Sequence, residues 1–144
     1  MFSFLIGKSP SISIKVNFED IQTIIKDIRY LLISTLASNE QNCLIPNTIN
    51  VDKEVDIING IKNKNTSIVI YGKNTNDKTL IKIYNQLISL AFSKVYIYQG
   101  GLFEWLCLQD IYGKKSFPTT GEELDILKYK PPPELCKNFY LQDK

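Results

Sequence analysis

The sequence is poor in the residues that hold metals. It contains no histidine and only three cysteines among 144 residues. Cys43, Cys107 and Cys136 are widely spaced and form no Cys-x-x-Cys pair. A zinc site of the usual cysteine–histidine kind is therefore excluded. An odd number of distant cysteines is typical of free thiols in a reducing compartment, and we expect no metal and no cofactor.

An excess of charge and long hydrophobic runs are also lacking. Seventeen Lys and Arg face 15 Asp and Glu, a net charge of +2, and Arg29 is the single arginine. Nucleic-acid-binding domains normally carry a clustered basic face, so the charge balance does not indicate a nucleic-acid partner. No apolar run approaches the roughly 20 residues of a membrane span, and the opening "MFSFLIGKSPSIS" is a poor signal peptide. We expect a soluble, cytoplasmic protein without a membrane partner.

Short apolar runs alternate with helical patterns along the chain. Near-continuous or alternating apolar residues predict strands over 11–16, 30–36, 67–71 and 94–98. Between them, "LIPNTINV" holds Pro46, which favours an extended crossing piece rather than a central strand. Strands alternating with helices predict an α/β fold in which helices flank a mostly parallel sheet on both faces.

Four helices are predicted between and after these strands. The first follows an N-cap at Asn17, with Asp20 completing a capping box, and ends near Arg29. The others cover 53–63, 77–92 and about 101–113. Apolar residues at helical spacing predict the buried faces. The residues expected to be buried include Ile21, Ile24, Ile25, Ile28, Val55, Ile58, Ile61, Leu102, Trp105, Leu106 and Ile111.

The composition changes after residue 113, which suggests a boundary. We expect a domain over 1–113 and an extension over 114–144 that is rich in proline and aromatic residues. Three prolines at 131–133 favour a polyproline II stretch. The extension is expected to pack on the domain or on a partner, and its aromatic residues suit either a binding surface or internal packing.

Three segments in order resemble the rhodanese-like family. They are "NCLIPNTINV" with Ile45 and Pro46, "SIVIYG", and "FSKVYIYQGGLFEWL" with Gly100, Gly101 and Trp105. The resemblance covers residues 12–112 and implies the rhodanese-like three-layer fold. The Pro-rich ending also resembles that of catalytically degenerate rhodanese-like proteins of large DNA viruses and protists, which implies a virion or viral factory as an alternative location.

The resemblance also implies a loss of chemistry. Active rhodaneses are sulfurtransferases that carry a persulfide on a cysteine directly after the central strand, within a loop whose N–H groups lower the thiol pKa and hold an anion. Gly72 stands at that position, so no persulfide can form there. The corresponding loop is Gly72, Lys73, Asn74, Thr75, Asn76, Asp77, Lys78 and Thr79.

A second family signature, D-x-R at the end of the preceding strand, is also absent. "DIR" at 27–29 imitates it, but spacing from Ile45-Pro46 assigns the two charged positions to Ser34 and Leu36. The resemblance therefore favours an inactive domain that serves as a protein-interaction or structural module, with a protein partner or self-association.

Two alternatives remain open at the level of sequence. One is a sulfurtransferase or phosphatase-like enzyme with a displaced nucleophile such as Cys43, although a small structural residue is the commoner role for such a cysteine. The other is binding of a small anion by the backbone of residues 72–79. Lys73, Lys78 and Lys82 could add to such a site, or simply form a solvated surface.

Overall fold

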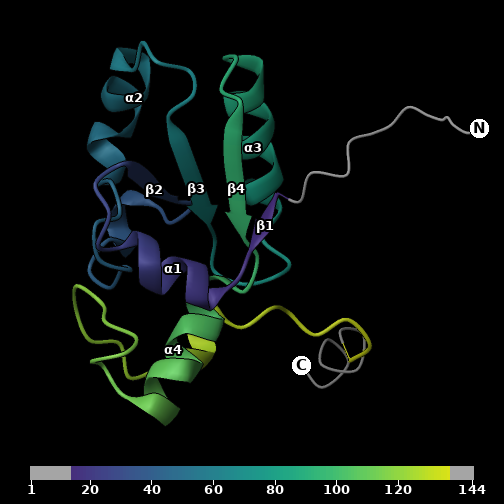
Figure 1. Ribbon diagram of the computed structural model, residues 1–144. Helices are drawn as coiled ribbons and strands as arrows, with labels where there is room; N and C mark the ends of the chain where they lie inside the picture. The colour runs from purple at the N-terminus through teal and green to yellow at the C-terminus, as the bar shows by residue number, and fades with distance from the viewer. Residues whose placement is uncertain (1–13, 137–144) are drawn as a thin grey trace, which may run out of the picture.

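The computed structural model of the protein describes residues 14–136, in which four parallel strands form one sheet (Figure 1). The strands are β1 (Lys15–Val16), β2 (Tyr30–Ser34), β3 (Ser67–Tyr71) and β4 (Lys94–Tyr98), and they lie in the order β1-β4-β3-β2. The predicted α/β fold with a parallel sheet is confirmed. The expected strand over 11–16 falls partly outside the described residues.

The central strand β3 is apolar because both of its faces are covered. Ile68, Val69 and Ile70 are each at most 2% exposed. Val69 packs into one hydrophobic cluster, whereas its neighbours Ile68 and Ile70 pack into the other. The alternation follows from the two-residue period of a strand, so a continuous apolar run fills two separate layers.

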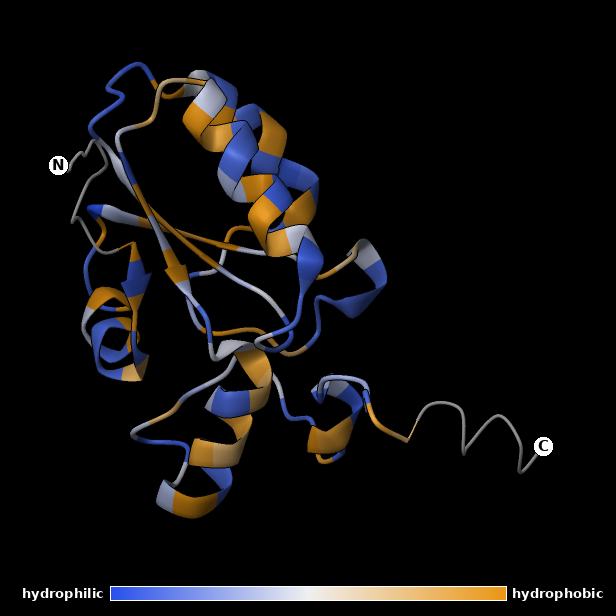
Figure 2. Cartoon of the chain, turned by 90° about the vertical axis from the view of Figure 1, so that its right-hand side faces the viewer, coloured by the Kyte–Doolittle hydropathy of each residue, from blue (hydrophilic) through white to orange (hydrophobic). Residues whose placement is uncertain are grey.

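Four α-helices form the outer layers. Residues of α1 (Phe18–Ile24) and α4 (Gly101–Tyr112) pack on one face of the sheet, and residues of α2 (Val51–Gly60) and α3 (Lys78–Ser89) pack on the other. Figure 2 shows the sheet between α1 and the α2–α3 layer, with α4 running away from the carboxyl ends of the strands. Two short 3₁₀ turns, η1 (Ser38–Glu40) and η2 (Ile126–Tyr129), lie in the connecting segments.

Side chains cap the starts of three helices. The predicted capping box of Asn17 and Asp20 is confirmed: Asp20 N donates to Asn17 Oδ1 at 3.1 Å and Asn17 N donates to Asp20 Oδ2 at 2.9 Å. Asn50 caps α2 by accepting from Asp52 N, and Asp77 caps α3 by accepting from Thr79 N. Each cap satisfies a backbone donor that the helix itself leaves unpaired.

Three residues expected in the core are exposed instead. Helix α1 ends at Ile24 because Lys26 N and Asp27 N bond to carbonyls three residues back, which tightens the chain into a turn. Ile28 is therefore 98% exposed. Val55 on α2 and Ile111 on α4 are 66% and 70% exposed.

Several predicted boundaries also shift. Strand β2 ends at Ser34 rather than at residue 36, and α2 covers 51–60 rather than 53–63. "DIR" at 27–29 is a turn, in which Arg29 donates to the carboxylate of Asp27. The crossing piece around Pro46 adds a single parallel bridge, Thr48 to Leu32, at the edge of the sheet.

The segment 114–136 lies against the rest of the molecule. Phe117 and Tyr129 are 4% and 2% exposed and belong to the α1–α4 core. Backbone bonds join Thr120 N to Leu44 O, and a side-chain bond joins Leu44 N to Thr120 Oγ1. Gly121 lies so close to the carbonyl of Asn42 that a Cβ there would clash with it.

Candidate functional site

The loop Gly72–Thr79, hereafter the 72–79 loop, lies at the carboxyl end of β3 beside the end of β4. This edge of a parallel sheet is where ligands usually bind in α/β proteins. The glycine pair Gly100-Gly101 follows β4 and leads into α4. The parallel pairing of β3 and β4 therefore brings these two segments together.

The start of α4 is joined to the 72–79 loop by backbone hydrogen bonds. Leu102 N donates to Gly72 O at 2.9 Å, and Phe103 N donates to Lys73 O at 2.8 Å. Gly101 has a φ of 69°, and a Cβ there would lie 2.6 Å from Gly72 O. Only glycine suits both the left-handed backbone and this close approach. Because the first N–H groups of α4 bind the loop's carbonyls, they are not free to bind an anion.

The carboxylate of Asp77 is folded back into the 72–79 loop. Its Oδ2 accepts from Lys73 N at 3.1 Å and from Thr35 Oγ1 at 2.5 Å. Its Oδ1 accepts from Thr79 N at 3.0 Å. The carboxylate of Asp77 thus accepts hydrogen bonds from backbone N–H groups near both ends of the 72–79 loop.

Gly72 is the residue that makes room for this carboxylate. A Cβ at position 72 would lie 2.9 Å from both Cβ and Cγ of Asp77, closer than real Cβ contacts. A side chain at 72 and the observed conformation of Asp77 therefore exclude each other. Thr35 was not among the residues predicted for this site. Its position could have indicated it, because Thr35 directly follows β2, whose carboxyl end is adjacent to that of β3.

Asn74 fastens the middle of the loop to the C-terminal segment. Its Oδ1 accepts from Asn76 N at 2.8 Å, and its Nδ2 donates to Tyr129 O at 2.8 Å. Asn74 is 8% exposed. Thr75, Asn76, Lys78 and Thr79 point into solvent. A depression of about 280 Å³ over the loop also has Pro132 in its wall.

Lys73 is directed away from the loop's interior. Its Nζ lies 2.8 Å from Glu40 Oε2. Burial alone would raise the pKa of Glu40, but hydrogen bonds from Lys73 and from Ala37 N lower it overall. The pair is partly exposed and holds η1 beside the loop, so this lysine is already engaged with an internal carboxylate.

The two positions assigned to the family's charged residues are buried and carry no charge. Ser34 and Leu36 are 4% and 1% exposed. Ser34 Oγ accepts a hydrogen bond from Leu36 N at 3.4 Å. Thr35, between them, supplies the contact with Asp77.

Tyr71 connects the end of β3 to the Ile45-Pro46 segment. Ile45 N donates to Tyr71 Oη at 3.1 Å, and Thr48 Oγ1 lies 2.8 Å from the same oxygen. Thr48 Oγ1 also lies 2.6 Å from Ile45 O and uses its proton there. The phenol of Tyr71 must then donate to Thr48, and complete burial, which raises its pKa, keeps it protonated.

A second carboxylate, that of Glu104, lies against Gly100. Tyr98 Oη donates to Glu104 Oε1 at 2.7 Å, and a Cβ at Gly100 would lie 2.5 Å from Glu104 Cδ. Trp105 is fully buried as expected. Its Nε1 donates to Pro118 O at 2.8 Å, and its ring meets Phe117 edge-on with centroids 5.0 Å apart.

The three cysteines are free thiols in different surroundings. Cys43 is 0% exposed, its thiol donates to Gly121 O at 3.5 Å, and burial raises its pKa. Cys107 is partly exposed on α4, and burial raises its pKa too. Cys136 is exposed. A raised pKa reduces the thiolate fraction, so neither Cys43 nor Cys107 has the surroundings of an activated nucleophile.

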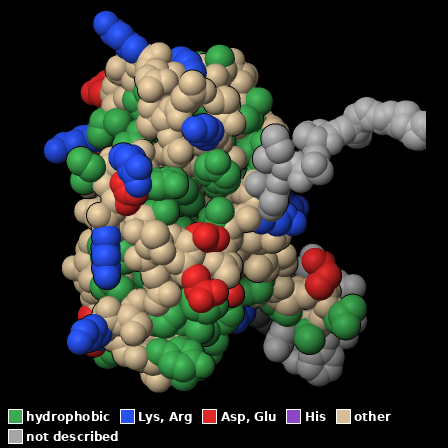
Figure 3. All heavy atoms as spheres, in the orientation of Figure 1, with side chains coloured by type: hydrophobic (Ala, Val, Ile, Leu, Met, Phe, Trp, Pro, Cys, Tyr) green, Lys and Arg blue, Asp and Glu red, His purple; other side chains and the backbone are tan. Residues whose placement is uncertain are grey.

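Residues 14–136 also lack two other kinds of feature. No group of three or more His, Cys, Asp or Glu side chains there could hold a metal ion. No helix within that range is long and apolar enough to cross a membrane. On the face seen in Figure 3, acidic and basic side chains are scattered rather than gathered by sign.

Two features define the class of this domain. It has a parallel α/β sheet, and the loop after the central strand is hydrogen-bonded to the helix that follows Gly100-Gly101. The family model "Rhodanese-like domain" matches residues 16–107. The chain therefore belongs to the rhodanese-like family. Among curated proteins, none matches its sequence.

Solved structures share the fold at low identity. The rhodanese-like domain of the Alr3790 protein from Anabaena sp. has a TM-score of 0.56 at 20% identity, over 85% of this chain and 88% of that one. The BH2092 protein from Bacillus halodurans has a TM-score of 0.58 at 17% identity, over 76% and 77%. The thiosulfate sulfurtransferase from Pseudomonas aeruginosa has a TM-score of 0.51 at 20% identity, over 67% of this chain and 19% of that protein. These likenesses establish the fold and not the activity.

Proposed function

We propose that this chain is a catalytically inactive rhodanese-like domain that acts as a protein-interaction module. The observation that carries the proposal is the Asp77 carboxylate beside Gly72. In the family that the chain belongs to, the side chain at this position is the sulfur carrier. Here the position has no side chain, and an internal carboxylate fills the space where one would extend.

The neighbouring groups support the same conclusion. A persulfide is an anion, and the backbone donors Lys73 N and Thr79 N that could stabilise one already bind Asp77. A negative carboxylate in that place would repel a second anion. This argues equally against the alternative of small-anion binding by the 72–79 loop. The buried thiol of Cys43, with its raised pKa, is poorly suited to replace the missing nucleophile.

The C-terminal segment supports an interaction role at this end of the molecule. Pro131 and Pro132 lie beside the 72–79 loop. Leu124, Leu127 and Leu135 are 84%, 62% and 98% exposed. Exposed leucines on a segment that is itself anchored by Phe117 and Tyr129 offer apolar contacts to another surface. We take the 114–136 segment and the adjoining loop as the first candidate surface for a protein partner or for self-association.

The inactivity is tested by two measurements on the purified chain. A thiosulfate:cyanide sulfurtransferase assay should give no rate above that of a buffer blank. Mass spectrometry after incubation with a persulfide donor should find no added sulfur on Cys43. A turnover that disappears when one cysteine alone is replaced by serine would overturn the proposal.

The interaction role is tested through the exposed leucines. Sedimentation velocity over a range of concentrations would detect self-association, and the triple variant Leu124→Ser, Leu127→Ser, Leu135→Ser should abolish it. A chain that stays monomeric and whose partner binding is unchanged by the triple variant would remove this surface from the proposal. The cytoplasmic location and the resemblance to viral and protist relatives stay predictions.

A further inference from the structure

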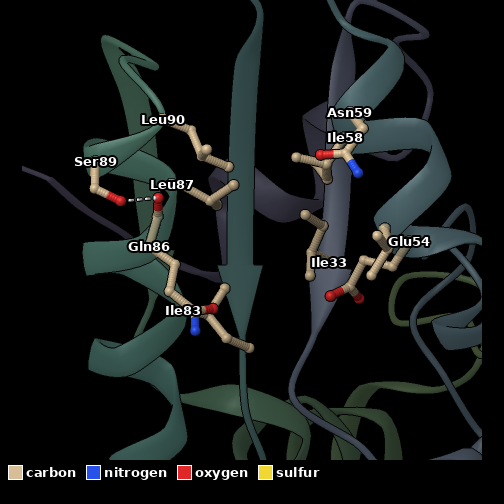
Figure 4. Close-up of a pocket in the computed structure, with 10 residues that line it drawn as sticks. Ile33, Glu54, Ile58, Asn59, Ile83, Gln86, Leu87, Ser89 and Leu90 are labelled. Carbon is tan, nitrogen blue, oxygen red and sulfur yellow. Dashed lines mark hydrogen bonds between the residues drawn. The ribbon is translucent and has the colours of Figure 1, made fainter.

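A mainly apolar hollow on the described surface lies away from the 72–79 loop, between α2 and the second half of α3. It encloses about 330 Å³. Ile33 of β2, Ile58 of α2 and Leu87 of α3 are buried at its base, at 1%, 8% and 3% exposure. Figure 4 shows side chains of α2 and α3 lining opposite sides of the hollow. We call this feature the α2–α3 groove.

The rim of the groove is apolar and open to solvent. Val55 on α2 is 66% exposed, and Leu90, directly after α3, is 46% exposed. These are costly positions for large apolar side chains in a free monomer. Because the apolar surface continues outward from the base, the groove fits an elongated segment better than an enclosed small molecule.

One ionisable side chain, Glu54, lines the groove. It extends from α2 toward Ile33 (Figure 4), and its Oε1 is buried without a hydrogen-bond partner. Glu54 Oε1 is the one buried side-chain N or O atom in the described chain that lacks such a partner. A buried acceptor left unpaired destabilises the fold, so a donor supplied from outside would relieve that cost.

Glu54 is the only charged side chain among the residues that line the groove. The other lining residues are apolar or neutral. The part of α3 that faces the groove, from Ile83 to Ser89, contains no charged residue. The groove therefore offers apolar contacts together with a single carboxylate.

We propose that the α2–α3 groove binds an amphipathic segment of a partner protein, in helical form, that inserts a lysine or arginine toward Glu54 between apolar side chains. The cation donates to Glu54 Oε1, and the apolar side chains cover Val55 and Leu90. The inference rests on the proposed role as an interaction module, but it concerns a surface at the opposite end of α3 from Asp77. It is therefore independent of whether the 72–79 loop performs chemistry.

The first test selects binders to the full chain from a display library of amphipathic helices of roughly 15 residues. Positions on the apolar face of each helix are randomised. We expect the selected helices to carry Lys or Arg within the apolar face and to shift the amide resonances of α2 and α3. Their binding should be lost with Val55→Asp and kept with Ile28→Asp, since Ile28 is also an exposed apolar residue but lies outside the groove. No selected binder, or binders without a cation, would overturn the proposal.

The second test measures how much the Glu54 carboxylate contributes to binding. Glu54→Gln should weaken the selected helix by about tenfold, the loss of one charge-assisted hydrogen bond. Asp56→Asn, on the same helix but not lining the groove, should change the affinity less than twofold. The folding stability of Glu54→Gln should not fall, which separates a binding residue from a structural one. Equal effects of the two substitutions would contradict the proposal.

The third test asks whether something other than a partner helix covers the groove, or whether the selected helices bind elsewhere. If sedimentation shows a dimer that Val55→Asp dissociates, the groove is covered by a second copy of this chain, and the proposal fails. If the selected helices bind with shifts confined to residues 114–136, the groove proposal fails while the interaction role stands. Sulfurtransferase activity would overturn the proposed inactivity and leave the groove result unaffected.

Discussion

The two faces of the sheet are finished in different ways. The face under α1 and α4 is sealed by Trp105, Phe117 and Tyr129, and the polar atoms at its edge find internal partners. The face under α2 and α3 leaves an open groove with an unpaired carboxylate oxygen. The C-terminal segment accounts for the difference, because residues of 114–136 join α1 and α4 on the first face and none of them packs on the second.

The two faces therefore differ in what a substitution is expected to change. The 72–79 loop, at the edge of the sealed face, is occupied by Asp77 and tied to Tyr129 by Asn74. The groove on the other face has buried apolar residues at its base and exposed apolar residues at its rim. Substitutions on the sealed side should therefore cost stability, whereas those in the groove should change binding.

The largest effect is expected at the centre of the sealed face. Trp105→Ala removes a fully buried ring, its contact with Phe117 and its hydrogen bond to Pro118 O. Large-to-small changes of this kind cost about 3–5 kcal/mol, and chemical denaturation would measure the loss. Tyr112→Ala, on the same helix but 66% exposed, is the control and should cost far less. Similar losses for both variants would contradict the sealed-core description.

The next effect is expected where the family's nucleophile would stand. Gly72→Cys forces its Cβ against Asp77 and should destabilise the fold by about 1–3 kcal/mol. In an Asp77→Ala background the same substitution should cost clearly less, so the double-mutant cycle gives a coupling energy. Gly60→Ala is the control, since no atom lies within 4 Å of its Cβ and it should not destabilise. An additive cycle would show that Asp77 does not occupy this space.

A smaller effect is expected where the loop meets the C-terminal segment. Asn74→Ala removes the bond from Nδ2 to Tyr129 O and leaves a buried carbonyl unpaired, a cost of about 1–2 kcal/mol. Hydrogen exchange should speed up in residues 126–130 more than in β3. Asn76→Ala, whose side chain is exposed, serves as the comparison. If exchange in 126–130 is unchanged, the loop and this segment are not coupled.

The smallest effect is expected in the groove and has the opposite sign. Burial raises the pKa of Glu54 in the folded chain. The folded state then holds its proton more tightly than the unfolded state. Stability is therefore present below the unfolded pKa and is lost as pH rises through the folded pKa.

Glu54→Gln should accordingly be slightly more stable than the parent chain at neutral pH, and no more stable well below the pKa of an ordinary glutamate. Thermal unfolding at both pH values would measure the difference. A variant that is less stable at neutral pH would assign Glu54 a structural role and weaken the contrast between the two faces.

Much of the fold could be predicted because it depends on local periodicity. Buried β-branched runs such as "SIVIY" read as strands, and the capping box at Asn17 and Asp20 is a local pattern. Exposure was harder to predict: Ile28, Val55 and Ile111 fit helical stripes but are exposed, because a stripe shows which side of a helix is apolar and not where the helix ends or which residues another element covers.

The amino-acid sequence is enough to establish that position 72 has no side chain and that histidine is absent, and its periodicity predicts a parallel α/β sheet. What fills the space beside position 72 depends on the tertiary structure. Asp77, Thr35 and Tyr129 come from three separate segments, and they meet through the stacking of parallel strand ends and the path of residues 114–136. The unpaired oxygen of Glu54 is likewise a property of packing, since hydrogen-bond partners depend on spatial neighbours rather than on sequence spacing.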